Sequence, residues 1–436
     1  MPLPDSIEII PLEKLVRADI SVPGSKSITN RALILAALAE GETTLSGALW
    51  SEDTTVMVEC LQDLGFMVNV RADPLEVCNR TITVYGKGGT VPPGGTEAQP
   101  LDLFVGNAGT AARFLAAFVC LGKGFYRLHG VPRMHERPQA DLFRALAQLG
   151  YRIDAPGEKL PAVICGAGRR EGKCRVSIGQ SSQFGSALVL CARTGGWQIE
   201  VTGENAEESA YLKMTSALVK IFPQRGGAFP IEPDASSGSY FWAAGALPLS
   251  EMRLESRDRL PVTVPSWPSS GLQPDARFPA IMPVRGVPTP LVISRAHDLG
   301  DSIMTAIVLA PFIEHAIVFS DLGRLRVQEC ERVAALRTEL GKCGAEVHER
   351  GDTLQIFPST LHGAEIETYN DHRMAMCFAI LGLKVTGIRL NNPACVKKTF
   401  PDFFQKLAAL PPHGLGVVIR DGRTGTELPM EELFAE

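Results

Sequence analysis

Three stretches of the chain share one pattern of apolar and polar positions. In each, a helix-like apolar run ends in Leu-Gly or Cys-Gly, and strand-like alternation follows at once; the glycines are Gly65, Gly150 and Gly344. Glycine at this place favours the left-handed cap that ends a helix, and two-residue alternation is typical of a strand. The pattern therefore predicts a duplicated unit of helix and strand.

A second pattern places polar turns directly before apolar helices. In the segment 22–41, a Pro-Gly turn is followed by Lys26 and Ser27, and Arg31 lies one turn later on the same predicted helix face. The free N–H groups of a helix start, a hydroxyl and two cations together favour an anion. The glycine spacing differs from the GxxxxGK[ST] phosphate loop, which argues against a nucleoside triphosphatase.

Similar polar turns recur further along the chain. Gly109 precedes one apolar run, and the hydroxyls and amide of residues 181–183 precede another. Cations also gather near predicted turns and helix starts, at Arg133, Arg137, Arg332, Arg373, Lys397 and Lys398. These cations fit either separate surface positions or a single basic pocket for a polyanionic substrate.

Two acidic residues, Asp301 and Glu329, each open an apolar helical run. Acids in this position either stabilise the helix start through its dipole, or act as proton acceptor and donor beside a basic pocket. The residues alone leave both interpretations open.

Composition narrows the class of protein. A length of 436 residues predicts two to three domains. The chain is slightly acidic, with 43 Lys and Arg against 48 Asp and Glu, which argues against a nucleic-acid partner. The apolar runs 32–39 and 303–313 are too short to span a membrane, and the first residues do not resemble a signal peptide. None of the ten cysteines forms a CxxC pair, which favours reduced thiols. The eight histidines show no HxxxH spacing, which argues against a metal site.

Taken together and in order, these segments resemble the family of 5-enolpyruvylshikimate-3-phosphate synthases (3-phosphoshikimate 1-carboxyvinyltransferases). The resemblance runs through SVPGSKSITNRA, GNAGTAARFL, PRMHERP, SSQF, LQPDARF, RVQECERVAALRTELGKCGAEV, NDHRMAM and KKTFPDFF. Within the family, the chain looks closest to the form that is one domain of the fungal pentafunctional shikimate enzyme. No long flanking segments remain for the other fungal activities, so we expect an enzyme that stands alone.

The resemblance implies an α/β (α+β) chain with the enolpyruvyl transferase fold. In that fold, two similar domains are each built from three repeated βαβαββ-type units. One domain is expected to combine residues 1–22 with 234–436, and the other to span residues 23–233. The active site is expected in the cleft between the domains, which close on their substrates.

The resemblance also implies the reaction. Family members transfer the carboxyvinyl group of phosphoenolpyruvate to the 5-hydroxyl of shikimate 3-phosphate and release phosphate, on the shikimate pathway to chorismate and the aromatic amino acids. We therefore expect a cytoplasmic monomer with these two small-molecule substrates, and without a metal, an organic cofactor, a nucleic-acid partner or a membrane partner.

The family motifs assign the site residue by residue. Asp301 is expected to accept the hydroxyl proton, and Glu329, helped by Lys26, to handle proton transfer at the methylene carbon. The residues expected around phosphoenolpyruvate are Lys26, Gly109, Arg133, Gln183, Arg332, Arg373 and Lys398. Those expected around shikimate 3-phosphate are Lys26, Ser27, Arg31, Ser181, Ser182, Gln183, Asp301 and Gln328.

The sequence departs from the family pattern around the acceptor. The family usually has Asn and Lys where this chain has Arg324 and Gln328, and Ser where it has Glu208, three residues before Tyr211. Gln328 removes a cation near the acceptor phosphate and Glu208 would repel that phosphate, whereas Arg324 and the neighbouring Ser209 can offset these losses. Two alternatives therefore remain: an enolpyruvyl transferase with an altered acceptor, and a non-catalytic homologue.

Overall fold

The chain folds into two units that share one internal plan. The computed structural model describes residues 3–203, 206–247 and 260–436, with the backbone alone for residues 206–209. Unit 1 combines Met1–Pro23 with Pro233–Glu436, and unit 2 spans Gly24–Glu232. The chain therefore passes from one unit to the other at two places.

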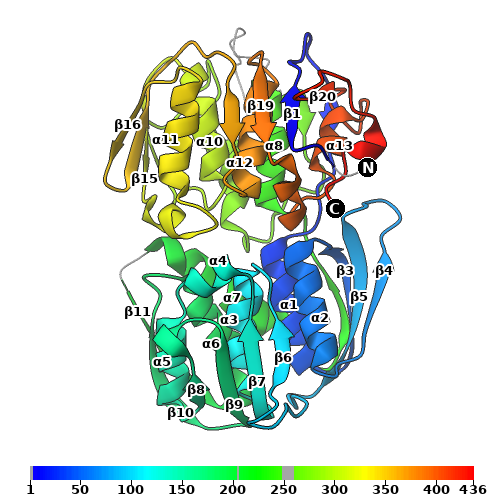
Figure 1. Ribbon diagram of the computed structural model, residues 1–436, viewed down its shortest axis with the longest axis vertical. Coiled ribbons are helices and arrows are strands. Elements are labelled where there is room, and N and C mark those ends of the chain that lie inside the picture. The colour runs from blue at the N-terminus through cyan, green and yellow to red at the C-terminus, as the bar shows by residue number, and fades with distance from the viewer. Residues whose placement is uncertain (1–2, 204–205, 248–259) are drawn as a thin grey trace. The chain divides into compact units, whose positions relative to one another are not determined.

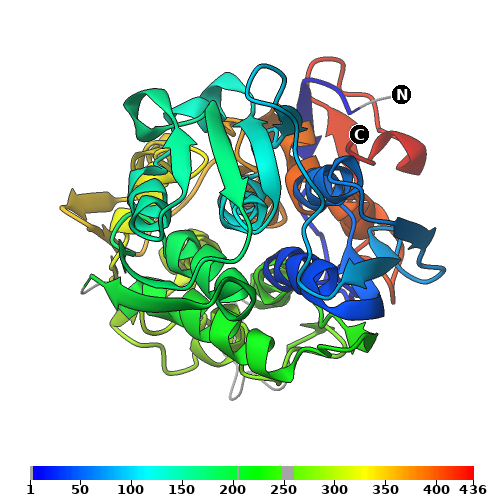
Figure 2. The same ribbon diagram turned by 90° about the horizontal axis from the view of Figure 1, so that it is seen from below.

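Unit 2 is organised around three inner helices that are buried on nearly all sides (Figure 1). They are α1 (Lys26–Leu38), α3 (Gly109–Val119) and α6 (Ser182–Gly195). The other helices are α2 (Glu52–Asp63), α4 (Pro132–Glu136), α5 (Ala140–Gln148) and α7 (Ala206–Ile221). Figure 2 looks along this unit, with helices seen nearly end-on inside a surround of strands.

Two four-stranded sheets of unit 2 have the same pattern, in which one parallel pair is followed by two antiparallel pairs. One contains, in spatial order, β6 (Leu101–Phe104), β7 (Lys123–His129), β9 (Ala162–Ala167) and β8 (Arg152–Asp154). The other contains β12 (Gly227–Pro230), β3 (Glu40–Leu49), β5 (Asn79–Lys87) and β4 (Val68–Ala72). A parallel pair, β10 (Gly172–Ser177) with β11 (Trp197–Thr202), completes the unit.

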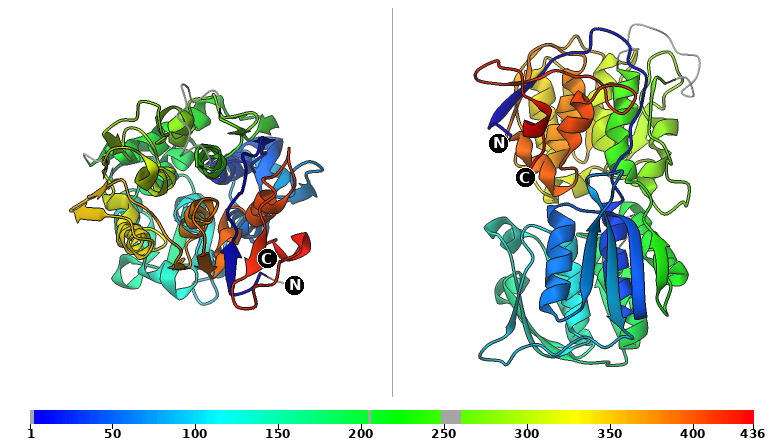
Figure 3. Two further views of the ribbon diagram at one scale, coloured as in Figure 1. Left: turned by 90° about the horizontal axis from the view of Figure 1, so that it is seen from above. Right: turned by 90° about the vertical axis from the view of Figure 1, so that its right-hand side faces the viewer.

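Unit 1 repeats this organisation. Its inner helices are α8 (Ala235–Ala246), α10 (Ile303–Leu309) and α12 (His372–Gly382), which lie inside the strands in Figure 3. Its remaining helices are α9 (Phe278–Ile281), α11 (Arg332–Lys342) and α13 (Phe403–Ala408). Short 3-10 turns include η4 (Pro274–Arg277), η6 (Gly323–Val327) and η7 (Pro393–Lys398).

The sheets of unit 1 show the same order of parallel and antiparallel pairs. One contains β14 (Val292–Ser294), β15 (Ile317–Ser320), β17 (Thr353–Ile356) and β16 (Val347–Arg350). Another contains β18 (Glu365–Glu367), β19 (Ile388–Asn391), β1 (Ser6–Ile9) and β20 (Ile419–Asp421). The strands β2 (Ala18–Asp19) and β13 (Val262–Thr263) form a short parallel pair.

The repeat predicted from the sequence is confirmed at its helix–strand junctions. Gly65, Gly150 and Gly344 follow α2, α5 and α11, have φ values of 86°, 86° and 89°, and lead into β4, β8 and β16. This left-handed backbone ends each helix, as glycine allows. The α/β fold class is confirmed. In each of the two units, the third repeat keeps only a parallel pair of strands among the described residues.

The inner helices of each unit contact one another within their first two turns. In unit 1, Ser239 Oγ lies 2.9 Å from Thr305 Oγ1, which lies 4.0 Å from Cys377 Sγ. In unit 2, the Arg31 guanidinium lies 5.2 Å from the centre of the Phe114 ring. The starts of these inner helices therefore lie close together within each unit. Their first turns carry the predicted site residues Lys26, Ser27, Gly109, Ser182, Gln183 and Arg373.

Two further expectations can be compared with the structure. All ten cysteines are free and eight are buried, as expected for reduced thiols. Within the described ranges, no helix combines the length and apolar character needed to cross a bilayer.

Candidate active site

Arg31 is the central cation of the candidate anion site in unit 2. Its side chain is buried, and its nitrogens donate to Thr215 Oγ1 at 2.7 Å, to Ser186 Oγ at 3.2 Å and to the Ser27 carbonyl at 2.8 Å. Burial lowers the pKa of Arg31 to about 10, because desolvation disfavours the charged form. These partners, within the described part of the chain, are uncharged oxygens, so the guanidinium suits an anionic ligand.

Gln183 joins the first turns of α3 and α6. Its Nε2 donates to Thr110 Oγ1 at 3.2 Å, and its Oε1 accepts from Arg113 Nη1 at 3.4 Å. Ser181 caps α6, because its Oγ accepts the Gln183 backbone N–H at 3.2 Å. The predicted residues Ser181, Ser182 and Gln183 are thus held together at the positive end of one buried helix.

Gly109 permits close packing at the start of α3. A Cβ atom at this position would lie 2.3 Å from Arg113 Nη1 and 2.7 Å from Arg137 Nη2, so a larger residue would have to displace a cation. Both arginines are buried. They add two positive charges to this helix start, although the family motifs did not assign them to a substrate.

Lys26 and Arg133 each have an acidic partner. Lys26 Nζ lies 3.1 Å from Asp53 Oδ2, and the Asp53 side chain is buried at the start of α2. Arg133, on α4, lies 2.6 Å from Glu136 Oε2, and both of these side chains are exposed. The Asp53 pair therefore orients Lys26 firmly, whereas an exposed pair such as Arg133–Glu136 restrains its members little.

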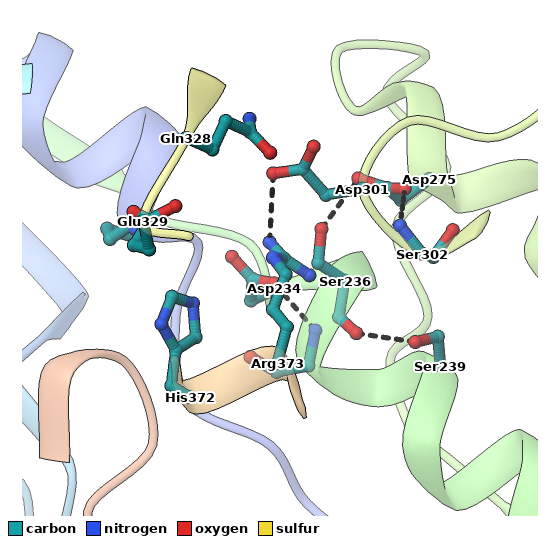
Figure 4. A network of polar contacts seen from close by, with 12 residues as sticks. Asp234, Ser236, Ser239, Asp275, Asp301, Ser302, Gln328, Glu329, His372 and Arg373 are labelled. Atoms are coloured by element: carbon teal, nitrogen blue, oxygen red, sulfur yellow. Dashed lines mark hydrogen bonds and ion pairs between the residues drawn. The ribbon is translucent and has the colours of Figure 1, made fainter. Parts of the chain in front are cut away.

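In unit 1, Asp301 lies between two buried arginines, just before α10. Its Oδ1 lies 2.6 Å from Arg295 Nη2 and its Oδ2 lies 3.3 Å from Arg373 Nη2; the pair with Arg373 is drawn in Figure 4. Burial opposes ionisation, but Arg373 and Arg295 outweigh it and hold the pKa of Asp301 well below its ordinary value. Asp301 is therefore an ionised carboxylate at neutral pH.

A second cluster surrounds Arg332, at the start of α11. Its Nε and Nη2 donate to the two oxygens of Asp371 at 2.7 and 3.1 Å, and Nη2 also lies 2.8 Å from Glu329 Oε2. Its Nη1 donates to Gln328 Oε1, and Lys398 Nζ lies 3.6 Å from Glu329 Oε1. Burial disfavours the charged guanidinium, but Asp371 and Glu329 more than compensate and raise the pKa of Arg332.

These contacts group the predicted residues of unit 1 into two clusters. Asp301 and Arg373 belong to one, while Gln328, Glu329, Arg332 and Lys398 belong to the other. Lys397 has a different partner from its neighbour Lys398. Its Nζ donates to the Glu436 backbone oxygen at 2.6 Å, at an exposed position.

One helix start differs from the prediction. Glu331, not Glu329, caps α11, because its side chain accepts the Ala334 N–H at 2.6 Å. Glu329 therefore lies outside the helix, and its carboxylate contacts Arg332 and Lys398 instead. The interpretation of Glu329 as an acid that opens the helix is wrong. The side chains of Glu208 and Ser209 lie outside the described residues.

Sequence reasoning did not single out Arg295 and Asp371. Asp371 caps α12 by accepting the Arg373 N–H at 2.9 Å, so the preference for Asp before a helix could have found it. Arg295 lies in an irregular segment after β14, six residues before its partner Asp301. No periodic pattern marks that pairing.

Nearly the whole chain is similar to proteins of one known family. The chain matches the family model of EPSP synthase (3-phosphoshikimate 1-carboxyvinyltransferase) over residues 12–407. The 3-phosphoshikimate 1-carboxyvinyltransferase of Trichormus variabilis is 38% identical over 434 residues, covering 92% of this chain and 98% of that one. The enzyme of the same name from Paraburkholderia phytofirmans is 37% identical over 454 residues, covering 93% and 99%.

Solved structures share the fold. EPSP synthase from Acinetobacter baumannii has a TM-score of 0.72 at 20% identity, over 95% of this chain and 99% of that one. The enolpyruvyl transferase NikO from Streptomyces tendae has a TM-score of 0.65 at 15% identity, over 98% and 100%. The fold is that of the enolpyruvyl transferases. The match over most of its length shows that the chain belongs to the EPSP synthase family.

Proposed function

We propose that this chain transfers the carboxyvinyl group of phosphoenolpyruvate to the 5-hydroxyl of shikimate 3-phosphate and releases phosphate. Membership of the family supports the reaction. The observation that carries the assignment of roles is the pair of carboxylates, Asp301 and Glu329, each held by buried cations in unit 1. The two proton transfers of this reaction need two such groups.

Asp301 is the proposed base for the acceptor hydroxyl. It is ionised, and both of its oxygens are oriented by arginines, so it can accept a proton without first losing one. As the hydroxyl oxygen bonds to C2 of phosphoenolpyruvate, its proton passes to Asp301. A bound substrate anion competes for Arg373, which raises the proton affinity of Asp301 when it is needed.

Glu329 is the proposed acid and base at the methylene carbon. In its protonated form it delivers a proton to that carbon while the new C–O bond forms, which gives a tetrahedral intermediate. When the bond between C2 and the phosphate oxygen breaks, the leaving phosphate takes up the proton that Asp301 accepted. Glu329 takes a proton back from the methyl group, and the double bond reforms. Contacts with Arg332 and Lys398 hold the carboxyl in place, and Lys26 of unit 2 is proposed to assist it.

The substrates are anions, and the proposed binding residues supply the charge to match. Arginine suits carboxylate and phosphate because its guanidinium donates two parallel hydrogen bonds. We assign Lys26, Gly109, Arg133, Gln183, Arg332, Arg373 and Lys398 to phosphoenolpyruvate. We assign Lys26, Ser27, Arg31, Ser181, Ser182, Gln183, Asp301 and Gln328 to shikimate 3-phosphate. That residues of both units act on one pair of substrates is part of this proposal, as are a monomeric state and a cytoplasmic location.

Phosphate release from phosphoenolpyruvate tests the function directly. We expect fast release when shikimate 3-phosphate is present, and at most slow release with unphosphorylated shikimate or another alcohol in its place. Asp301→Asn should remain folded by circular dichroism and lose turnover. Release that is equally fast with an unphosphorylated acceptor would contradict the proposed acceptor, and no release with any acceptor would contradict catalysis.

A further inference from the structure

Asp275 links the starts of two inner helices of unit 1 (Figure 4). It is buried in η4; its Oδ1 accepts the Ser302 backbone N–H at 2.8 Å and its Oδ2 accepts the Ser236 hydroxyl at 2.6 Å. Ser302 directly follows Asp301, and Ser236 is the second residue of α8. A single carboxylate therefore ties the backbone beside Asp301 to a neighbouring helix.

The bond to Ser302 satisfies a buried donor. An N–H at a helix start has no acceptor within the helix, and the Ser302 side chain makes no capping hydrogen bond. Ser302 is completely buried, so without Asp275 its N–H would lack a partner at a considerable cost. The helix starts of α8 and α10 and the bonds from Ser236 and Ser302 favour the charged form of Asp275, against the burial that raises its pKa. The position of Asp301 thus depends on a residue that is 26 positions away in the chain.

Gln273, two residues before Asp275, also holds a helix start, namely that of α8. Its Oε1 accepts the Ala235 N–H at 2.9 Å and its Nε2 donates to the Pro233 carbonyl at 2.8 Å. It is also buried. Gln273 therefore supports the start of α8, whereas Asp275 also contacts the residue next to Asp301.

We propose that Asp275 is a positioning residue for Asp301. By binding Ser302 and Ser236, it fixes the backbone from which the Asp301 carboxylate projects, and it adds a negative charge to the surroundings of that carboxylate. The inference rests on the proposed function, in which Asp301 accepts the proton of the acceptor hydroxyl.

The charged groups that act on Asp301 come from several elements. Arg295 follows β14, Arg373 is the second residue of α12 and Arg332 begins α11, while Asp275 belongs to η4. Burial raises the pKa of Asp275, and the nearby charge of Asp301 raises it further. Because such an interaction is mutual, the charge of Asp275 makes Asp301 a stronger base than the three arginines alone would leave it.

Asp275→Asn is the variant that tests this inference. The amide keeps the size of the side chain and an oxygen for the Ser302 N–H, but it removes the charge and the acceptor for Ser236. With phosphoenolpyruvate and shikimate 3-phosphate, kcat should fall at least about tenfold, because both the position and the basicity of Asp301 change. The KM for phosphoenolpyruvate should change less than about threefold, and the acidic limb of the kcat–pH profile should move to lower pH.

Gln273→Ala is the matched control. It removes a buried helix-start contact from the same segment, so it should lower the melting temperature while leaving the kcat–pH profile in place. Wild-type kcat and an unshifted profile in Asp275→Asn would overturn the proposal, and so would an equal shift in Gln273→Ala. If Asp275→Asn does not fold, Ser236→Ala provides the test, and an unchanged kcat in that variant would overturn the proposal. Absence of turnover in the unaltered enzyme would instead remove the proposed function.

Discussion

Asp371 and Arg332 form a two-point ion pair in which both carboxylate oxygens accept from the guanidinium, at 2.7 and 3.1 Å. Both side chains are buried, and the Asp371 carboxylate also accepts the backbone N–H of Arg373. Asp371 therefore holds Arg332 beside Glu329, and it also fixes the start of α12, which carries Arg373. The two clusters of the candidate site in unit 1 are coupled through this residue.

Asp371→Ala should destabilise the protein strongly. The substitution leaves Arg332 buried without its main partner, and breaking a buried pair on one side costs about 3–5 kcal/mol of unfolding free energy. Urea denaturation measures this loss. Asp371→Asn is the control, because it keeps an acceptor for the Arg373 N–H and should lose less. A loss below about 1 kcal/mol in Asp371→Ala would show that the pair contributes little.

The stability contributed by Asp301 should depend on pH. Its pKa is depressed in the folded protein, so its contribution is fully present above the unfolded value of about 3.9 and is lost as the pH falls below it. The difference in unfolding free energy between the wild type and Asp301→Asn should therefore be constant from pH 7 to 5 and should shrink towards pH 3. Denaturant titrations at each pH measure it. A difference that grows on acidification would contradict the depressed pKa.

Glu329→Gln should lower kcat by about 10²- to 10⁴-fold while the protein stays folded. Glutamine keeps the size and an oxygen for Arg332, but it cannot carry the proton. Steady-state phosphate release measures the loss. Glu331→Gln offers a control two residues away, because Glu331 caps α11 and contacts Arg326 at 2.8 Å. Near-normal turnover in Glu329→Gln would remove Glu329 from its proposed role.

Arg324→Ala should raise the KM for shikimate 3-phosphate more than the KM for phosphoenolpyruvate. If Arg324 supplies the cation that Gln328 lacks near the acceptor phosphate, it contributes a charge-assisted hydrogen bond of about 1.5–3 kcal/mol, or roughly tenfold to a hundredfold in affinity. Arg326→Ala is the matched control on the same turn, η6, because Arg326 already contacts Glu331, Glu349 and Asp352. Equal changes in the KM of both substrates would exclude a specific role for Arg324.

Much of the fold was predictable because it depends on local patterns. The glycines that end α2, α5 and α11 stand out in the sequence, since a left-handed residue is needed exactly where each helix gives way to a strand. The apolar runs that became α1 and α10 were visible for the same reason. Local patterns did not give the strand partners of β1, because β19 and β20 come from the far end of the chain. Only the family resemblance grouped residues 1–22 with residues 234–436.

Local patterns marked the candidate site where its residues occupy recognisable helix starts, whereas others, such as Gln328, were assigned only through the family motifs. Lys26, Ser181 and Arg373 occupy such starts, which is why a short motif marks each of them. The pairing of Asp301 with Arg295, and the support of its backbone by Asp275, depend on tertiary packing between irregular segments. No local propensity encodes such contacts.

The buried inner helices also determine how the protein should exchange its amide hydrogens. Amides in the middle of α3 and α12 are enclosed and bonded within the helix, so they should exchange only when the whole unit opens. Amides of the first turn have no acceptor within the helix, and Ser181 and Asp371 each cap one of them in α6 and α12, so the other first-turn amides should be the earliest to exchange. A substrate anion that binds those N–H groups would slow them selectively. Exchange at the starts of α6 and α12 would then report occupancy of each unit separately, without any turnover.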